Sequence, residues 1–265
     1  MNKKQMIRMG IGMLVIPVLA ACSSSEDQES AVATSVAATM EVSAPTAAPP
    51  PTQAPAPTAA PTQVPTPTAI PGNPADALGD PNGKDPFDNA NNWTLFNNNC
   101  FATTIIGGKF VMEAKGALEL SCWEVSWPLI KDYYYQSEVV MPVACNANDR
   151  FGLFFRAPDN DRGFLFGIQC DGKYSLSSWD GENTNIIVAP IDNTIISTSP
   201  ESINVIGVVA DGSTMSLYAN GQFLAQAQNV GFADNGKIGY FVRAAVKDEG
   251  FVVQYDNLAI WLLDQ

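Results

Sequence analysis

The 265-residue chain contains no histidine. Histidine is the usual base beside a serine or cysteine nucleophile, and it is the commonest metal ligand in proteins. Its absence therefore excludes Ser-His and Cys-His catalysis. The sequence also has no CxxC pair, which together with the missing histidine leaves no zinc ligand set.

Basic residues are scarce as well. The chain has 14 Lys and Arg against 27 Asp and Glu, a net charge of −13. The first 21 residues carry Lys3, Lys4 and Arg8 but no acid, so the chain without them would have a charge of −13 − 3 = −16. Nucleic acids and anionic membrane surfaces are bound through Lys and Arg, so this composition argues against both partners. Acidity of this kind is more typical of a soluble surface than of cation binding.

The chain has only one apolar stretch near its start, and it is too short to span a bilayer comfortably. Met1–Arg8 is basic, Met9–Val18 is apolar, and Leu19-Ala20-Ala21-Cys22 follows. This order is typical of a secretory signal, and an apolar run of this length falls below what a membrane span needs.

Leu19–Cys22 resembles the lipobox of bacterial lipoproteins. In that family, cleavage precedes the cysteine, whose thiol receives a diacylglycerol and whose new amino group is acylated, as with palmitate. The resemblance implies a membrane anchor through lipid on Cys22, at an outer membrane or the outer face of the plasma membrane. Several acyl chains on one residue anchor a protein far more firmly than one. An ordinary signal peptide with an incidental cysteine is the alternative.

Proline is crowded into one region. Ser23–Gly72 consists mainly of Ala, Pro, Thr, Ser and Val, which cannot bury a core. In an extended polyproline form, fifty such residues would reach about 100–150 Å. We therefore expect a signal peptide at 1–21, a lipidated cysteine and disordered linker at 22–84, and a folded domain at 85–265.

From Asp85 onward, short apolar-aromatic runs recur about every ten residues, and no segment shows a sustained helical period. The pattern predicts an all-β fold, a two-sheet antiparallel jelly-roll sandwich of about a dozen strands. The dipeptides between runs are turn formers: Gly107-Gly108, Asp211-Gly212, Asn220-Gly221 and Asn235-Gly236.

The clearest stretch is Arg150–Gly181. Its three runs, Phe151–Arg156, Gly163–Gln169 and Lys173–Trp179, predict an antiparallel meander, and Asp180-Gly181 is a hairpin signal. Alternation along the first run places Phe151, Leu153 and Phe155 in the core and Arg156 on the opposite side.

Four cysteines remain beyond Cys22, and export would place them where disulfides form. Of the three pairings, we favour Cys145–Cys170, whose residues flank the meander's first strands, together with Cys100–Cys122. Each bridge would contribute about 3 kcal/mol through the entropy of the loop that it closes.

Five strand-and-turn motifs recur between Asp85 and Leu263: Phe151–Arg156, Gly163–Phe166, Cys170–Leu176, Leu217–Gly221 and Val253–Leu258. With them the segment resembles the concanavalin A-like lectin/glucanase superfamily, closest to its laminin-G-like and 3-keto-disaccharide hydrolase-like branch. The resemblance implies two stacked sheets with a concave face that binds or acts on carbohydrate.

Retaining glucanases of this superfamily carry Glu-x-Asp-x-x-Glu on one strand, and this chain has no such pattern. Glu124 and Glu138 could meet across strands, but solvated carboxylates are the simpler interpretation. Whether the protein is an enzyme stays open. The absence of histidine and of the glucanase pattern favours a protein without catalytic activity.

Sugar binding needs an exposed aromatic plate and planar polar donors, which Trp and Arg supply. The candidates are Trp179, Arg156, Trp127 and Arg243, with the first two on the polar side of their strands. The alternative is that these residues cover the rim of the sheet. The run Tyr133-Tyr134-Tyr135 predicts at least one exposed tyrosine.

No cofactor is certain, but a structural calcium ion is a candidate because jelly-roll modules often hold one near their chain ends. Asp88 and Asp256 are its candidate ligands, since first and last strands are often neighbours. Asp159 and Asp161 are the alternative pair, and turn formation is the simpler explanation for all four.

These observations give three hypotheses. The first is a bacterial surface lipoprotein that displays a non-catalytic, lectin-like module for a glycan or another cell-envelope ligand. The second is a sugar-processing enzyme, a glycoside hydrolase or a 3-keto-glycoside hydrolase. The third is a structural envelope protein without a small ligand.

Overall fold

The computed structural model describes residues 72–263, except 119, 229–230 and 233. The predicted signal peptide, Cys22 and nearly all of the predicted linker lie outside the described residues. Within the described part, no helix is long and apolar enough to cross a membrane.

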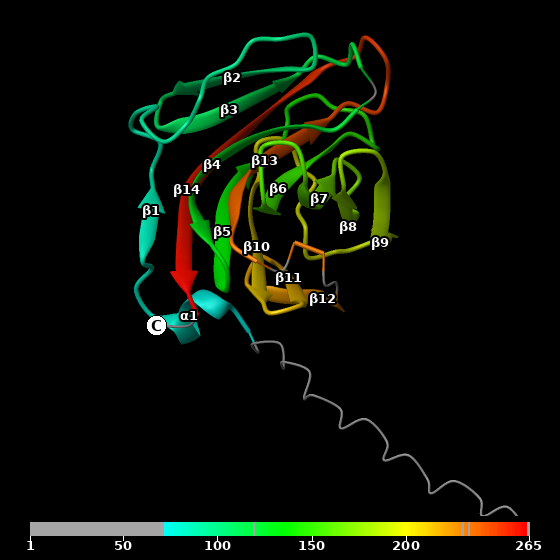
Figure 1. The fold of residues 1–265 in the computed structure, drawn as a ribbon. Coiled ribbons are helices and arrows are strands. Elements are labelled where there is room, and N and C mark those ends of the chain that lie inside the picture. Colours follow the sequence, from blue (N-terminus) through cyan, green and yellow to red (C-terminus); the bar gives the residue numbers. More distant parts are fainter. Residues whose placement is uncertain (1–71, 119, 229–230, 233, 264–265) are drawn as a thin grey trace, which may run out of the picture. The chain divides into compact units, whose positions relative to one another are not determined.

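Two antiparallel sheets face one another (Figure 1). The larger one, here sheet A, has the strand order β12-β11-β10-β5-β14-β3-β2, with β1 also paired to β14. Its strands are β1 (Gly83–Asp85), β2 (Phe101–Ile106), β3 (Lys109–Ala114), β5 (Tyr133–Val140), β10 (Ile203–Asp211), β11 (Thr214–Ala219), β12 (Gln222–Gln228) and β14 (Phe251–Leu262).

The smaller sheet, here sheet B, has the order β4-β13-β6-β7-β8-β9. Its strands are β4 (Cys122–Ile130), β6 (Arg150–Ala157), β7 (Gly163–Gln169), β8 (Tyr174–Trp179), β9 (Thr184–Ile191) and β13 (Gly236–Arg243). The predicted jelly-roll sandwich is confirmed, and the predicted meander is β6-β7-β8, whose neighbours pair antiparallel.

The main core lies between the sheets and draws on both of them. Phe151, Leu153 and Phe155 of β6 enter it, as the alternation predicts, and they meet Tyr135 and Tyr255 among the residues from sheet A. Removal of these large side chains from water is a favourable contribution to folding.

A second, smaller cluster covers the outer face of sheet A. The short helix α1 (Pro74–Leu78) contributes Ala75 and Leu78, which pack against Tyr134 and Trp261. This layer buries the middle tyrosine of Tyr133–Tyr135, while its neighbours point into the main core, so the expectation of an exposed tyrosine is wrong. The described fold also includes α1 and the first two residues of β1, which precede Asp85.

Both predicted disulfides are present. Cys100–Cys122 joins the segment before β2 to the start of β4, and so connects the two sheets. Cys145–Cys170 joins the loop before β6 to the end of β7. Their Cα atoms are 6.2 and 6.4 Å apart, within the range that a disulfide spans.

Candidate functional site

A groove of about 350 Å³ lies on the outer face of sheet B, away from the main core. Its floor and walls come from five strands of that sheet, β4, β13, β6, β7 and β8, with Thr184 from β9 at one side. The lining residues are Leu120, Ser121, Trp123, Arg150, Leu165, Ser177, Trp179, Thr184 and Arg243.

The apolar floor exists because β7 carries glycines at outward positions. A Cβ at Gly163 would come within 2.8 Å of the Phe154 ring. A Cβ at Gly167 would come within 2.7 Å of the Phe241 ring and 2.8 Å of Arg150 Cγ. Because these positions have no side chain, both rings and the arginine stem lie down on the sheet. With Leu165 they form a buried layer that only sheet B contributes to.

Two tryptophans pack on this layer from different strands. Trp123 of β4 stacks on Phe154 with ring centroids 4.9 Å apart, and its Nε1 donates a hydrogen bond to the Asn160 carbonyl at 2.7 Å. Trp179 of β8 packs against the same layer. Both indoles are partly exposed, so each is fixed by packing while it still presents surface to the groove. A rigid aromatic surface of this kind suits the apolar face of a sugar ring.

Two arginines line the groove. Arg150 of β6 and Arg243 of β13 are direct Cα partners. The guanidinium carbon of Arg150 lies 5.5 Å from the centre of the Phe241 ring, and Nη1 donates to Ser175 Oγ at 3.4 Å. Burial, and next the neighbouring charge of Arg243, lower the pKa of Arg150 to about 10. At neutral pH, Arg150 is therefore still a cation.

Three polar atoms on or beside this surface are buried without a hydrogen-bond partner among the described residues. They are Arg150 Nε, Ser177 Oγ and Gln169 Oε1. Ser177 lines the groove, and Gln169 is the Cα partner of Arg150 on β7. Buried polar groups are nearly always paired, so a cluster of unpaired ones beside a groove indicates a ligand or ordered water.

The six strands of sheet B hold a single carboxylate, Glu124 of β4. Glu124 alternates with Trp123 and Val125, which pack on the groove side, and so it faces the interior. Burial raises its pKa to about 7. Glu138 belongs to sheet A, so the two glutamates considered as a pair lie in different sheets. No strand under the groove supplies the two carboxylates of a glycosidase.

Of the four residues predicted to bind ligand, the structure brings Trp179 and Arg243 to the same groove. The side chain of Trp127 lies outside the described residues, although its backbone belongs to β4. Sequence reasoning missed Trp123 and Arg150. Trp123 lies four residues before Trp127 on the same strand, so alternation places both on one face, and this could have identified Trp123. Arg150 was missed because it lies just before the apolar run of β6.

The predicted placement of Arg156 on the polar side is wrong, because its side chain is fully buried. Phe154 and Ala157 pair with Gly239 and Lys237, so two residues of β6 oppose one residue of β13. Arg156, with φ of 49°, occupies this bulge, which shifts the alternation by one residue. Its guanidinium then lies 3.6 Å from Asp132, away from the groove.

The candidate calcium ligands are not gathered into a site. Asp88 is exposed, and Asp256 Oδ2 lies 3.4 Å from Lys109 Nζ. Asp159 forms an ion pair with Arg162, 2.6 Å away. The described residues contain no group of three or more acidic or cysteine side chains that could hold a metal ion. Calcium binding stays a prediction.

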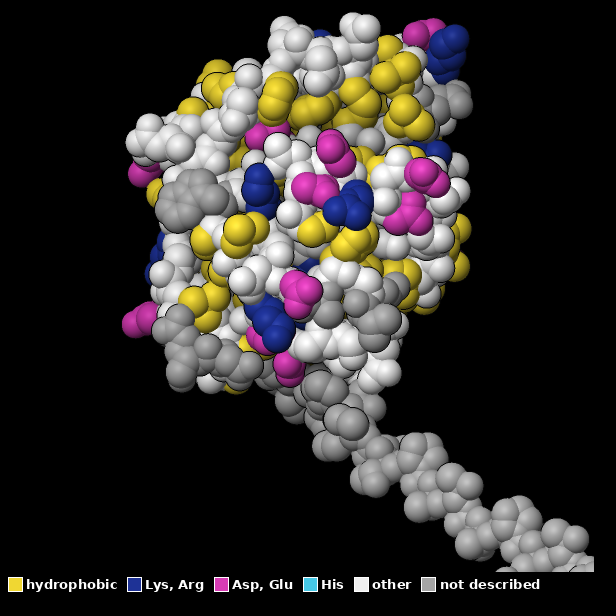
Figure 2. Space-filling view, in the orientation of Figure 1, with side chains coloured by type: hydrophobic (Ala, Val, Ile, Leu, Met, Phe, Trp, Pro, Cys, Tyr) yellow, Lys and Arg dark blue, Asp and Glu magenta, His cyan; other side chains and the backbone are white. Residues whose placement is uncertain are grey.

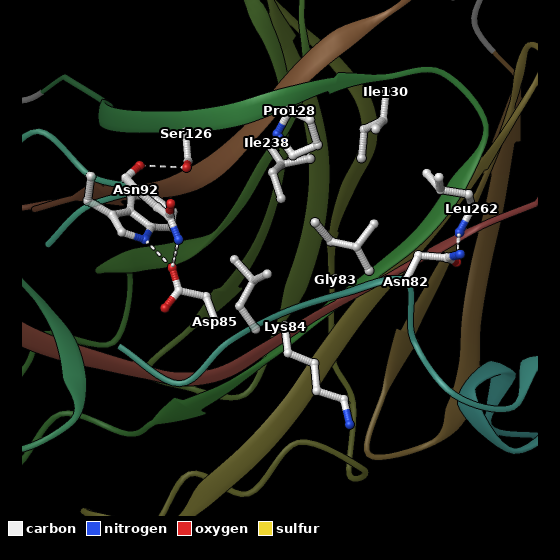
Figure 3. Close-up of a pocket in the computed structure, with 13 residues that line it drawn as sticks. Asn82, Gly83, Lys84, Asp85, Asn92, Ser126, Pro128, Ile130, Ile238 and Leu262 are labelled. Carbon is white, nitrogen blue, oxygen red and sulfur yellow. Dashed lines mark hydrogen bonds between the residues drawn. The ribbon is translucent and has the colours of Figure 1, made fainter. Parts of the chain in front are cut away.

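A second cavity of about 260 Å³ lies between the edges of the two sheets, beside β1 and β4 (Figure 3). Its walls are mainly apolar side chains such as Ile130, Ile238 and Leu262. Its buried carboxylate, Asp85, already accepts hydrogen bonds from Phe87 N, Asn92 Nδ2 and Trp93 Nε1. Because these polar groups already bond one another, the cavity offers a ligand mainly apolar walls. It is therefore the weaker candidate for a binding site.

Acidic side chains do not collect into one patch on the face in Figure 2. They are scattered among neutral polar groups and interspersed with Lys and Arg. This distribution fits the interpretation of the net charge as a determinant of solubility.

Comparison with known proteins defines the fold. A prokaryotic β-1,3-1,4-glucanase (lichenase) from a mouse hindgut metagenome is 12% identical, with a TM-score of 0.54 over 68% of this chain and 99% of that one. A Bacillus licheniformis β-glucanase is also 12% identical, with a TM-score of 0.52 over 70% and 99%. A Bacillus subtilis protein of unknown function with a galectin-like fold is 11% identical, with a TM-score of 0.51 over 69% and 96%.

The described domain therefore has the concanavalin A-like fold that the strand-and-turn motifs predict. No protein-family model matches the chain, and no curated protein does. At these identities the likeness defines the architecture alone, and the branch of the superfamily stays a prediction.

Proposed function

We propose that this protein is a non-catalytic glycan-binding module that uses the groove on sheet B. The observation that carries the proposal is the pairing of two packed, partly exposed tryptophans, Trp123 and Trp179, with unpaired polar atoms on one surface. Aromatic faces bind the C–H side of a sugar, and fixed donors and acceptors bind its hydroxyls. The likeness in fold to two glucanases and a galectin-like protein supports a sugar ligand.

A sugar-processing enzyme is the rival function. It would need a general acid and a second carboxylate within about 5–10 Å of each other. The only carboxylate in the strands of sheet B faces the interior, so this surface favours binding without turnover. A purely structural envelope role would require ordered water to satisfy the unpaired polar atoms of the groove.

We further propose that lipid on Cys22 anchors the module at the bacterial cell surface. Support comes from the sequence, in which a basic segment, an apolar segment and Leu-Ala-Ala-Cys follow in order. The Pro-, Thr- and Ala-rich composition of the following residues suits a spacer between membrane and domain.

A glycan array with the purified full-length chain tests the binding function, beside a Trp179→Ala variant. The variant should bind the recognised glycan at least about tenfold more weakly, because a packed aromatic anchor is the kind of residue that dominates affinity. Phe223→Ala is the matched control, since Phe223 is an exposed aromatic on β12 of the other sheet.

The control should bind like the unaltered chain. Absence of binding to every glycan would contradict the lectin hypothesis, and unchanged binding by Trp179→Ala would contradict the site. Release of sugar from a bound oligosaccharide would instead establish the enzyme.

A further inference from the structure

Arg150 and Arg243 form a pair of like charges on the groove surface. They are directly opposed on adjacent antiparallel strands, so both side chains leave the same face of the sheet. Directly opposed like charges destabilise a sheet. A pair of this kind persists in a folded protein when something else compensates for it.

That compensation is not an acidic side chain of the described domain. Four arginines are described, and the other two have acidic partners: Arg162 lies 2.6 Å from Asp159, and Arg156 lies 3.6 Å from Asp132. Among the described residues, neither Arg150 nor Arg243 takes part in an ion pair. The chain has 27 acidic residues, so the missing partner does not reflect a shortage of them.

Arg150 is also held in one position. Its stem crosses Gly167, where a Cβ would come within 2.9 Å of Arg150 Cδ, and its guanidinium lies beside the Phe241 ring. Nη1 bonds Ser175, while Nε is buried and has no partner. A preorganised guanidinium loses little conformational entropy on binding, and its planar donors match the oxygens of a carboxylate or sulfate.

We propose that the ligand of this groove is an acidic sugar, whose carboxylate or sulfate ester binds to Arg150 and Arg243. The inference rests on the proposed glycan-binding function and adds the chemical class of the glycan. The anion supplies the missing counter-charge, and the tryptophans hold the ring that carries it. Ser177 Oγ, which is buried and unpaired at the groove, is placed to bond a sugar hydroxyl.

Isothermal titration of the full-length chain with two matched pairs of oligosaccharides tests this proposal. One pair is an oligogalacturonide and its methyl ester, and the other is a κ-carrageenan oligosaccharide and its desulfated form. At least one charged member should bind about tenfold or more tightly than its neutral counterpart, because hydrogen bonds to charged groups are the stronger ones. The pair that shows the difference identifies carboxylate or sulfate.

Arg150→Gln and Arg243→Gln should each remove most of this preference, so that affinity for the charged member falls at least about tenfold more than affinity for its neutral counterpart. Arg243 is exposed, so its variant should fold normally even if the change at Arg150 disturbs the sheet. Lys115→Gln makes the same change in net charge after β3 of the other sheet and should have no effect.

The outcomes separate the two proposals. Equal binding of charged and neutral members, still sensitive to Trp179→Ala, would overturn the acidic assignment and leave glycan binding intact. Absence of binding to all four oligosaccharides and to the glycan array would overturn both. An equal loss on Lys115→Gln would show a non-specific charge effect and overturn the arginine site.

Discussion

Glu124 is a buried carboxyl group on the inner side of β4, the strand that carries Trp123 on the groove side. Burial raises its pKa from the ordinary value of 4.5 to about 7, although a backbone hydrogen bond at Thr94 and the charge of Lys237 act the other way. The folded protein therefore holds this proton more tightly than the unfolded chain.

This difference predicts a pH-dependent stability. Below about pH 4.5 both states are protonated, and the carboxyl group costs nothing. Between about pH 4.5 and 7 the unfolded chain releases the proton first, so stability falls as pH rises, and above pH 7 the loss is complete. Glu124→Gln should raise the free energy of unfolding at pH 8 by about 2 kcal/mol and change it little at pH 4.

Thermal unfolding of both chains between pH 4 and pH 8 measures this effect. Glu113→Gln, which removes a carboxylate at an exposed position of β3, is the matched control for the change in net charge. A constant difference between Glu124→Gln and the unaltered chain across this range would contradict the assignment.

At the scale of the element, β7 determines the shape of the groove. Its inward residues are the large apolar Phe164, Phe166 and Ile168, whereas Gly163 and Gly167 leave the outward side flat. The neighbouring strands then supply side chains that lie across it. The groove therefore depends on the absence of side chains at Gly163 and Gly167 on the outward face of β7.

Gly167→Ala tests this dependence. The added Cβ would lie within 2.8 Å of Arg150 Cγ and 2.7 Å of Phe241, and both side chains would have to shift. We expect a loss of about 1–3 kcal/mol in the free energy of unfolding, measured in urea, because overpacking costs this much. Ligand affinity should fall with it.

Gly83→Ala is the matched control in β1. There the nearest side-chain atoms would be 3.9 Å away, an ordinary contact, so stability should change by less than about 0.5 kcal/mol. Undiminished affinity of the Gly167→Ala variant would show that the arginine position does not matter for binding.

The elements also show how far the sequence predicts this molecule. Alternation and Asp-Gly turns are local signals, and they were sufficient for the β6-β7-β8 meander and for the side of Trp179. The bulge at Arg156 was not predictable, because it is a one-residue shift set by pairing with β13 far along the chain. Arg150 and Arg243 become neighbours through the same pairing of β6 with β13. Their proximity could therefore not be predicted from the sequence of either strand alone.

For the whole molecule, the proposed lipid anchor on Cys22 is the feature to test. Replacement of Cys22 by serine removes the thiol that lipidation requires, and the protein should then appear in the soluble fraction instead of the membrane fraction. Cell fractionation with an antibody to the domain measures this. As a control, Cys145→Ser removes a disulfide sulfur from the domain and should leave membrane association unchanged. Retention of the Cys22→Ser variant in membranes would rule out lipid on Cys22 as the anchor.

The position of α1 has a consequence for how the module meets its ligand. The described chain begins on the outer face of sheet A, where α1 packs, whereas the groove opens on the outer face of sheet B, across the full thickness of the sandwich. The described N-terminal residues therefore enter the domain on the face opposite the groove, and none of them lines it. Copies attached side by side could engage successive units of one polymer, so that weak individual contacts would add up to firm, multivalent adhesion.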